Sequence, residues 1–321
     1  MLRKTLPIVS VLVVAAIAVT QTVTHTLTGH ASGVTALAFS PDGRLLLTGG
    51  AGYAARLWET YSGALARTLK DSATCAAFLP DGKQFALGGR ATSGSSGVIR
   101  VFDLGMDEPK LTIPAHTTAV HALAVSPDGR LLASTAQERV VKVWNAQTGE
   151  HLTSLDGVRP SASVAFGFDG QTLAASARGG VRLYELATAQ LKRELEHEEV
   201  NSIAFSPDGK WLASGSGGVF QGILQGEVRL WEVESGELKR THKALTTSVA
   251  FTPDGKFLAT GGSGDTQGDV RLWEVTTGNL RNTLFGHGSW VVALAFSSDG
   301  TRLATGSLDK TAKLWDVSAL K

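Results

Sequence analysis

Histidine is the residue type in this 321-residue chain best suited to bind a metal or transfer a proton, and the chain has eight. Five stand at nearly the same distance before the end of a short apolar run: His30, His116, His242 and His287 share one offset, and His197 is one residue nearer. Equivalent places in a repeat belong to different structural units, so these side chains cannot converge on one metal ion. We therefore expect each of them to be structural, with a hydrogen bond inside its own unit, and we predict no metal site.

Other groups that could carry chemistry are few. The single cysteine, Cys75, excludes an intramolecular disulfide and a cysteine-cluster metal site. The other units hold only Ala or Ser at its place in the repeat, so we expect a small packed side chain rather than a reactive thiol. The common nucleophile, zinc-protease and phosphate-loop motifs are absent, and residues 265–269 lack the alternating ligands and distal Glu of a calcium loop. The sequence predicts no catalytic residue and no cofactor.

Charge is spread evenly along the chain. Lys and Arg number 30 against 29 Asp and Glu, which gives a formal net charge of +1. Proteins that bind nucleic acids present a concentrated basic face, and this sequence contains no such concentration. We therefore predict no nucleic-acid partner.

The first 20 residues differ in kind from the rest. Arg3 and Lys4 precede an almost wholly apolar stretch over residues 6–20, with the small residues Ala16 and Ala18 near its end. This order is typical of a secretory signal peptide, and the stretch is shorter than the about 20 apolar residues that cross a bilayer. We predict a signal peptide over residues 1–20, with a short retained membrane anchor as the alternative. Both versions place the rest of the chain outside the cytoplasm, in the periplasm, secreted or tethered on the outer side.

From residue 21 onward one pattern occurs seven times, with the period of roughly 40–45 residues that marks a propeller blade. Each unit has an apolar run, a turn of the Pro-Asp-Gly type, a second run, and a third run that ends in an aromatic residue. The turns contain Asp42, Asp81, Asp128, Asp169, Asp208, Asp254 and Asp299. The aromatic residues are Trp58, Phe102, Trp144, Tyr184, Trp231, Trp273 and Trp315.

These units predict an all-β fold. Apolar residues alternate at period 2, as in strands, and a further turn after the third strand leads into a fourth. Four antiparallel strands form a blade that cannot bury its own faces, so we predict a single seven-bladed β-propeller over residues 21–321. The last unit has no fourth strand of its own, whereas an extra strand over residues 22–28 precedes the first. We predict that this N-terminal strand pairs with the C-terminal blade and closes the ring.

The combination of Gly-His, Pro-Asp-Gly, Ser/Thr-Gly, Asp and Trp-Asp resembles the WD-repeat (WD40) β-propeller family from residue 22 onward. A blade of that family can contain a buried relay of hydrogen-bonded His, Ser/Thr, Asp and Trp side chains. The resemblance implies such a structural relay in the last unit, formed by His287, Thr305, Asp309 and Trp315. It implies incomplete relays in the first and third units, and the second and fourth units lack the histidine.

In this family the partner-binding face is made by the loops between second and third strands and between successive blades. Three of these loops are longer than the repeat requires, over residues 90–97, 217–226 and 261–268. The second contains four apolar residues that would meet water, which suggests a contact site: Val219, Phe220, Ile223 and Leu224. The alternative is that this loop folds onto the ring or pairs as an extended hairpin.

The resemblance also places the residues beside the first inward valine of each blade on that face. These include Thr35, Ala119, His121, Glu199, Asn201 and Trp290. Trp290 is the best candidate for an anchor, because tryptophan is enriched at the centres of interfaces. It could instead cap the mouth of the central channel.

The N-terminal segment and the resemblance together imply an exported, bacterial-type member of the family, and we predict that it is not an enzyme. We expect a scaffold outside the cytoplasm that binds a protein or peptide on its loop face, functions as a monomer, and meets a membrane only through its N-terminal segment. The alternative is a propeller enzyme, or a sensor that binds a ligand or metal in its central channel. Fold alone does not decide between them.

Overall fold

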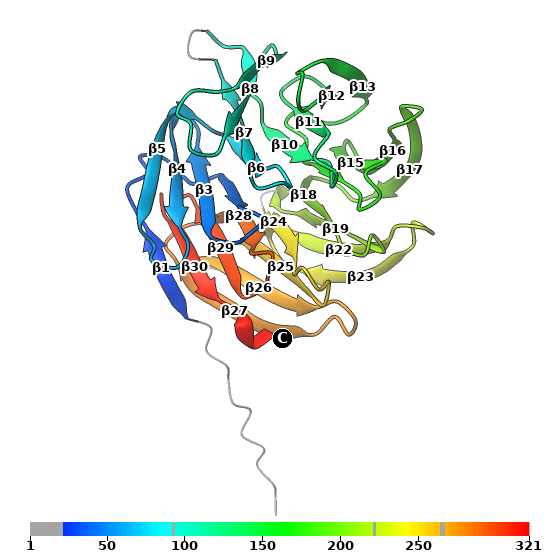
Figure 1. Cartoon of the computed structure of the whole chain (residues 1–321). Coiled ribbons are helices and arrows are strands. Elements are labelled where there is room, and N and C mark those ends of the chain that lie inside the picture. The colour runs from blue at the N-terminus through cyan, green and yellow to red at the C-terminus, as the bar shows by residue number, and fades with distance from the viewer. Residues whose placement is uncertain (1–21, 92–93, 221–222, 264–266, 321) are drawn as a thin grey trace, which may run out of the picture.

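The computed structural model describes residues 22–320, apart from 92–93, 221–222 and 264–266. The segment 1–20, with its predicted signal peptide or anchor, lies outside the described residues, as do Asp265 and Thr266 of the loop considered for calcium. Seven four-stranded antiparallel sheets are arranged around a common axis (Figure 1). The predicted seven-bladed propeller is therefore confirmed.

Within each blade the strands run from the innermost to the outermost in hydrogen-bonded order. Blade 1 is β2 (Ala36–Phe39), β3 (Leu45–Gly50), β4 (Tyr53–Glu59) and β5 (Leu65–Ser72). Blade 2 is β6 (Cys75–Phe78), β7 (Gln84–Arg90), β8 (Gly97–Asp103) and β9 (Leu111–His116). Blade 3 is β10 (Ala122–Val125), β11 (Leu131–Thr135), β12 (Val140–Asn145) and β13 (His151–Asp156). Blade 4 is β14 (Val164–Phe166), β15 (Thr172–Ala177), β16 (Gly180–Glu185) and β17 (Gln190–Glu196).

The remaining blades follow the same plan. Blade 5 is β18 (Val200–Phe205), β19 (Trp211–Ser216), β22 (Glu227–Glu232) and β23 (Leu238–Lys243). Blade 6 is β24 (Thr246–Phe251), β25 (Phe257–Gly262), β26 (Gly268–Glu274) and β27 (Leu280–His287). Blade 7 is β28 (Val291–Phe296), β29 (Arg302–Ser307), β30 (Ala312–Asp316) and β1 (Val23–Leu27). A two-stranded sheet of β20 (Gly218–Phe220) and β21 (Ile223–Gln225) interrupts blade 5, and a short 3-10 helix covers Ser318–Leu320.

The N-terminal strand closes the ring as predicted. In Figure 1 the blue β1 lies beside the red β30, and their antiparallel register sets Leu27 opposite Ala312. The backbone N–H of Asp316 also donates to the carbonyl of Thr22 at 3.1 Å. Leu27 is 1% exposed and packs with residues of blades 7 and 1. The first strand of the chain therefore joins the last blade and supplies part of the core at the seam.

The hydrophobic core lies between the blades. Each of the seven clusters of buried apolar side chains in the described part of the chain combines residues of two neighbouring blades. Ala259 and Leu272 of blade 6, for example, pack with Leu303 and Trp315 of blade 7. Since every blade buries both faces against its neighbours, the ring behaves as one unit.

A cationic side chain stands two residues before the aromatic residue in every blade: Arg56, Arg100, Lys142, Arg182, Arg229, Arg271 and Lys313. Six of the seven contact the outer strand of the preceding blade or the connection that follows it. Lys142 Nζ, for example, donates to the carbonyl of Ala115 at 2.8 Å. In blade 2 the contact is an ion pair of 3.2 Å between Arg100 and Asp71, both largely buried. These contacts fasten each outer edge to the next blade.

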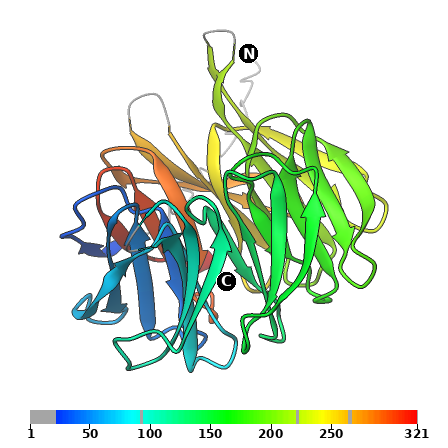
Figure 2. The ribbon, with the colours of Figure 1, turned by 90° about the horizontal axis from the view of Figure 1, so that it is seen from above.

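The two ends of the ring carry different connections. We call the end with the Pro-Asp-Gly-type turns the turn face, and the opposite end, with the loops between second and third strands and between blades, the loop face. Figure 2 shows the yellow-green hairpin of β20 and β21 rising from the loop face above the neighbouring loops. No helix in the described part of the chain is long and apolar enough to cross a membrane.

Candidate functional site

The last blade contains the full relay, and each of its polar atoms has a partner. Trp315 Nε1 donates to Thr305 Oγ1 at 2.9 Å, and the same hydroxyl lies 2.7 Å from His287 Nε2. His287 Nδ1 lies 2.8 Å from Asp309 Oδ2. Burial lowers the pKa of His287, although Asp309 opposes the effect. Partial burial would raise the pKa of Asp309, but hydrogen bonds from Thr311 and His287 outweigh it and lower the pKa to about 2.

Because His287 is neutral near pH 7, the relay has one consistent direction of donation. The indole N–H donates to Thr305, the threonine hydroxyl donates to the imidazole Nε2, and the imidazole Nδ1–H donates to Asp309. Every donor is satisfied inside the protein, and His287 is 2% exposed. This arrangement stabilises the blade and leaves no group available to a substrate.

Three other blades form versions of the relay. In blade 1 His30, Thr48 and Trp58 are joined at 2.7 and 2.8 Å. In blade 3 His116 lies 2.9 Å from Ser134 and 3.0 Å from Glu138. In blade 5 His197 lies 2.6 Å from Ser214, whose hydroxyl also accepts from Trp231. The described part of the chain brings no three His, Cys, Asp or Glu side chains together in a group that could hold a metal ion.

His242 departs from the expected structural hydrogen bond. The connection between β23 and β24 is short, so His242 lies inside β23, opposite Val228. The equivalent pairing in the next blade joins Val270 to the buried Leu284. The His242 ring stacks on Trp273 at 4.5 Å between centroids, and burial followed by the Arg240 charge lowers its pKa. His242 therefore occupies a core position that is leucine in the neighbouring blade.

Cys75 is a packed side chain in the inner strand of blade 2. Burial raises the pKa of its thiol to about 12. A Cβ placed at Gly88 would lie 2.5 Å from its sulfur, so the two strands are in close contact here. A thiol with this pKa is not a nucleophile at neutral pH.

The polar residues at the start of the inner strands tie neighbouring blades together. Thr35 Oγ1 donates to the carbonyl of Thr74, which lies in blade 2, at 3.2 Å. The hydroxyls of Thr74 and Thr247 donate in the same way to the carbonyls of Val120 and Val291. At the equivalent place Asn201 Nδ2 donates to the carbonyl of Thr246 at 3.2 Å. Thr35 and Asn201, which the sequence placed on the loop face, therefore have structural contacts there.

His121 occupies the equivalent place in blade 3 but makes no such bond. The carbonyl of Ala162, the corresponding acceptor in blade 4, accepts from Thr135 Oγ1 at 2.6 Å. The His121 side chain is exposed, and within the described residues its ring has no hydrogen-bond partner. Partial removal from water and then the nearby Arg159 charge lower its pKa. His121 is thus a neutral ring on the loop face with a free donor and a free acceptor.

Arg159 was not predicted from the sequence. Its Nη1 donates to the carbonyl of Val200 in blade 5 at 2.8 Å, and Nη2 lies 3.7 Å from the carboxylate of Glu199. Glu199 is 75% exposed in its side chain and has a positive φ of 52°, unusual for a residue other than glycine. The structure therefore brings His121, Arg159 and Glu199 near one another on the loop face.

Trp290 lies on the opposite side of the ring, in the connection before β28. Its side chain is half-buried, and its carbonyl accepts a hydrogen bond from the N–H of Leu308 at 3.0 Å. Leu308 is 48% exposed. Blade 7 therefore presents two large apolar residues on the loop face, and these are separate from the His121 group in blade 3.

The loop 217–226 forms the extended hairpin that the sequence left open as an alternative. The register sets Val219 opposite Leu224 and Phe220 opposite Ile223. The side chains of these four residues lie outside the described part of the structure.

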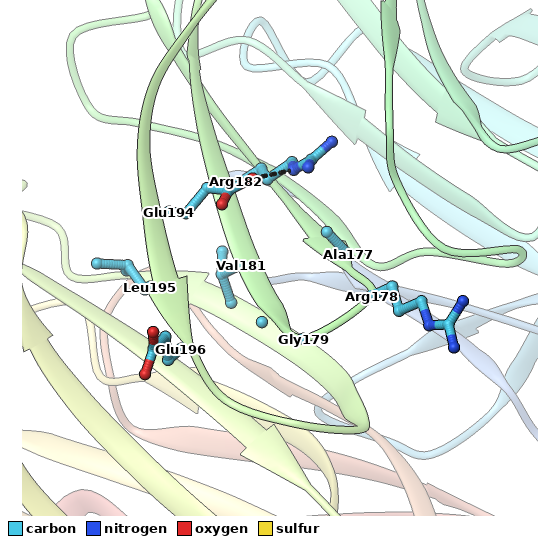
Figure 3. A pocket seen from close by; sticks show the side chains of 9 residues that line it. Ala177, Arg178, Gly179, Val181, Arg182, Glu194, Leu195 and Glu196 are labelled. Atoms are coloured by element: carbon cyan, nitrogen blue, oxygen red, sulfur yellow. Dashed lines mark hydrogen bonds and ion pairs between the residues drawn. The ribbon is translucent and has the colours of Figure 1, made fainter.

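Two pockets lie away from these residues. One of about 210 Å³ is at the outer edge of blade 4, where Arg182 pairs with Glu194 at 2.6 Å and Arg178 and Glu196 complete a charged rim (Figure 3). It contains no nucleophile and no group of metal ligands. The other, of about 380 Å³, lies on the turn face between Pro253 and Ser298. Carboxylates in both linings are engaged in contacts of the fold: Glu194 pairs with Arg182, and Asp254 accepts hydrogen bonds from Thr252 and Lys256.

Comparison with known proteins gives two family matches. The model of the WD40 family, described as "WD domain, G-beta repeat", matches residues 21–59, 107–145 and 278–316. The model of the eukaryotic translation initiation factor eIF2A matches residues 173–263. Each WD40 match covers the outer strand of one blade and the three inner strands of the next: β1 with blade 1, β9 with blade 3, and β27 with blade 7.

Relatives of similar length and of greater length align with the chain. A guanine nucleotide-binding protein subunit beta of Oryza sativa subsp. indica is 27% identical over 329 residues, which cover 92% of this chain and 83% of that protein. Pre-mRNA-processing factor 19 homolog 2 of Arabidopsis thaliana is 27% identical over 65% of this chain, but only 39% of that protein is covered. The target of rapamycin complex subunit wat1 of Schizosaccharomyces pombe is 29% identical over 54% of this chain and 56% of that protein. The chain is therefore similar to WD40-repeat proteins, both in the three segments that match the family model and in the alignment with the guanine nucleotide-binding protein subunit beta.

Proposed function

We propose that this propeller is a non-catalytic platform that binds a protein or peptide through its loop face. The observation that carries the proposal is the hairpin of β20 and β21, which projects from that face and has apolar residues at two of its three cross-strand pairs. Exposed apolar residues are costly unless a partner covers them. Trp290, with Leu308 beside it, offers a second apolar contact on the same face.

The distribution of the polar side chains supports binding rather than catalysis. The relay histidines are engaged in hydrogen bonds within their blades. The threonines at the start of the inner strands and the Arg or Lys two residues before each aromatic residue are engaged in contacts between blades. His121 and Glu199 are the exposed polar candidates on the loop face, and they would supply specificity to a contact made mainly by apolar residues. Two of the relatives are named as subunits, the guanine nucleotide-binding protein subunit beta and the target of rapamycin complex subunit wat1, which agrees with a role in assembly.

The place of action is part of the same proposal. The apolar segment 6–20, with basic residues before it, supports export and action outside the cytoplasm, and with export we propose a bacterial-type member of the family that functions as a monomer. Mass measurement of the N-terminus of the protein isolated from its own cells tests this. A start between residues 18 and 22 in the extracytoplasmic fraction agrees with export and cleavage. An intact Met1 in the cytoplasmic fraction contradicts it.

The binding proposal is tested by affinity capture with matched variants. The triple variant Phe220→Ala, Ile223→Ala, Leu224→Ala and the single variant Trp290→Ala should fold normally and lose a partner that the wild type retains. Phe168→Ala is the control, because Phe168 is 67% exposed on the turn face. Equal capture by all variants would contradict the proposal. A small molecule or metal that raises the melting temperature, with no protein partner captured, would favour a ligand-binding propeller instead.

A further inference from the structure

Asn201, at the start of the inner strand of blade 5, makes a different hydrogen bond within its own blade from the threonines at the equivalent position. Thr74 and Thr247 donate to the next blade and also to a carbonyl of their own blade, that of Gly88 or Gly261, each at 3.0 Å. In blades 2 and 6 the residue that follows the threonine pairs with this glycine across the two inner strands. In blade 5 the residue that follows Asn201 pairs with Gly215 in the same way. Asn201 Nδ2 instead donates to the carbonyl of Gly217 at 2.7 Å. The longer side chain thus reaches two residues further, to the segment that leads into β20.

A second contact holds the base of the hairpin through the relay of blade 5. His197 uses Nδ1 for Ser214 and places Nε2 3.0 Å from Ser216 Oγ. The Ser216 hydroxyl lies 3.3 Å from both the N–H and the carbonyl oxygen of Glu227, across the base of the hairpin. In blade 7 the second nitrogen of the relay histidine faces Asp309. In blade 5 the second nitrogen of His197 instead contacts Ser216, whose hydroxyl links the two ends of the hairpin.

The return strand is fixed as well. The N–H of Ala244 donates to the carbonyl of Gly226 at 3.1 Å. A Cβ at Gly226 would collide with the carbonyl oxygen of Ser216 and would lie 2.8 Å from the Cα of Gly217. The two ends of the hairpin therefore approach so closely that only glycine fits, and both ends are held: Gly217 by Asn201 of blade 5, and Gly226 by Ala244 of the connection between β23 and β24.

We propose that Asn201 is a positioning residue, which sets the direction of the hairpin of β20 and β21 through Gly217 and need not touch the partner. This rests on the proposed function of the hairpin as a contact. A hairpin already held in its bound direction loses less conformational entropy on binding. The hydrogen bond from Asn201 to Gly217 would therefore raise the affinity without adding a contact to the partner. The role differs from a direct partner contact for Asn201, which the sequence alone had suggested.

The substitution Asn201→Thr separates the two roles. Threonine at this place keeps the bond to the next blade, as Thr74 and Thr247 do, but is too short to reach Gly217. We expect the melting temperature to change little and the hairpin amides at 218–225 to exchange with solvent about fivefold faster, the change that follows from one lost hydrogen bond. Affinity for a captured partner should fall by a similar factor. Thr74→Ala is the control, since it removes an equivalent bond far from the hairpin and should leave hairpin exchange unchanged.

Unchanged exchange of the hairpin in Asn201→Thr would overturn the positioning role, whatever happens to binding, because a direct contact would not affect the free protein. Faster exchange together with failure of the wild type to bind any protein would support the positioning role of Asn201 and overturn the proposed function. If Asn201→Thr does not fold, Ser216→Ala gives the same readout, because it frees both ends of the hairpin from His197. Exchange that is unchanged in this variant would equally overturn the proposal.

Discussion

His30 and His197 should make the stability of the propeller depend steeply on pH. Both side chains are buried, at 7% and 2% exposure. Burial lowers the pKa of each from 6.5 to about 4, and the charges of Arg56 near His30 and Arg229 near His197 add to the effect. In the unfolded chain both imidazoles regain an ordinary pKa. Between pH 6.5 and 4 the unfolded state therefore binds more protons than the folded state, and the free energy of unfolding falls as the pH falls.

The size of the effect follows from the two pKa values. A fall from 6.5 to about 4 corresponds to about 3 kcal/mol per histidine once both states are fully protonated. Between pH 7.5 and pH 5.0 each histidine should account for a loss of about 2 kcal/mol, and the two together for about 4 kcal/mol. Carboxylates contribute little in this interval, because most of them stay ionised in the unfolded chain at pH 5.

Urea unfolding at pH 7.5 and pH 5.0 measures this difference, with the free energy extrapolated linearly to zero urea. His30→Gln and His197→Gln should each reduce the difference by about 2 kcal/mol, whatever they do to stability at pH 7.5. His151→Gln is the control, since His151 lies exposed on β13. A variant at His30 or His197 with the pH dependence of the wild type would refute the view that these side chains are neutral in the fold.

Three further predictions concern the ring itself. Deletion of residues 22–28 should abolish cooperative thermal unfolding, because β1 supplies both an edge and part of the core at the seam; a truncated protein that melts like the full chain would contradict the closure. Asp71→Asn should cost about 3 kcal/mol in urea unfolding by leaving the Arg100 guanidinium without its buried carboxylate, whereas Glu108→Gln at an exposed pair should cost under about 1 kcal/mol. Thr305→Val should lower the free energy of unfolding by about 2 kcal/mol, because two buried partners lose their hydrogen bond; a calorimetric loss near zero would exclude a stabilising relay.

The architecture was predictable because the signals that fix it recur seven times. Turn residues, alternating apolar runs and a terminal aromatic residue each mark a strand end, and the mismatch between the two ends of the chain predicts the closing strand. The relay of blade 7 followed from the family resemblance alone. His242 shows where equal spacing misleads. A shorter connection between β23 and β24 sets it opposite Val228, where it stacks on Trp273, whereas the relay residue His287 lies opposite Gly268 at the end of β27.

The details of the loop face were less predictable. Apolar residues in a long loop fit a folded-down loop, a hairpin or a contact, and only the register of β20 and β21 decides for the hairpin. The second role of Asn201 depends on a side chain that crosses to Gly217, and no sequence pattern measures that reach. Arg159 could have been noticed as the one basic residue in the connections that lead into the inner strands. Its contact with the carbonyl of Val200 joins residues 41 positions apart in the sequence, and no local pattern predicts it.

Photo-crosslinking in the native cells tests most directly whether the loop face is the binding surface. A photoreactive amino acid is placed at Gln225, which is exposed at the end of β21, or at Phe168 on the turn face. The account predicts a covalent adduct with another protein from position 225, its loss in the triple variant of the hairpin, and no adduct from position 168. An adduct from position 168 alone, or none from position 225, would contradict it.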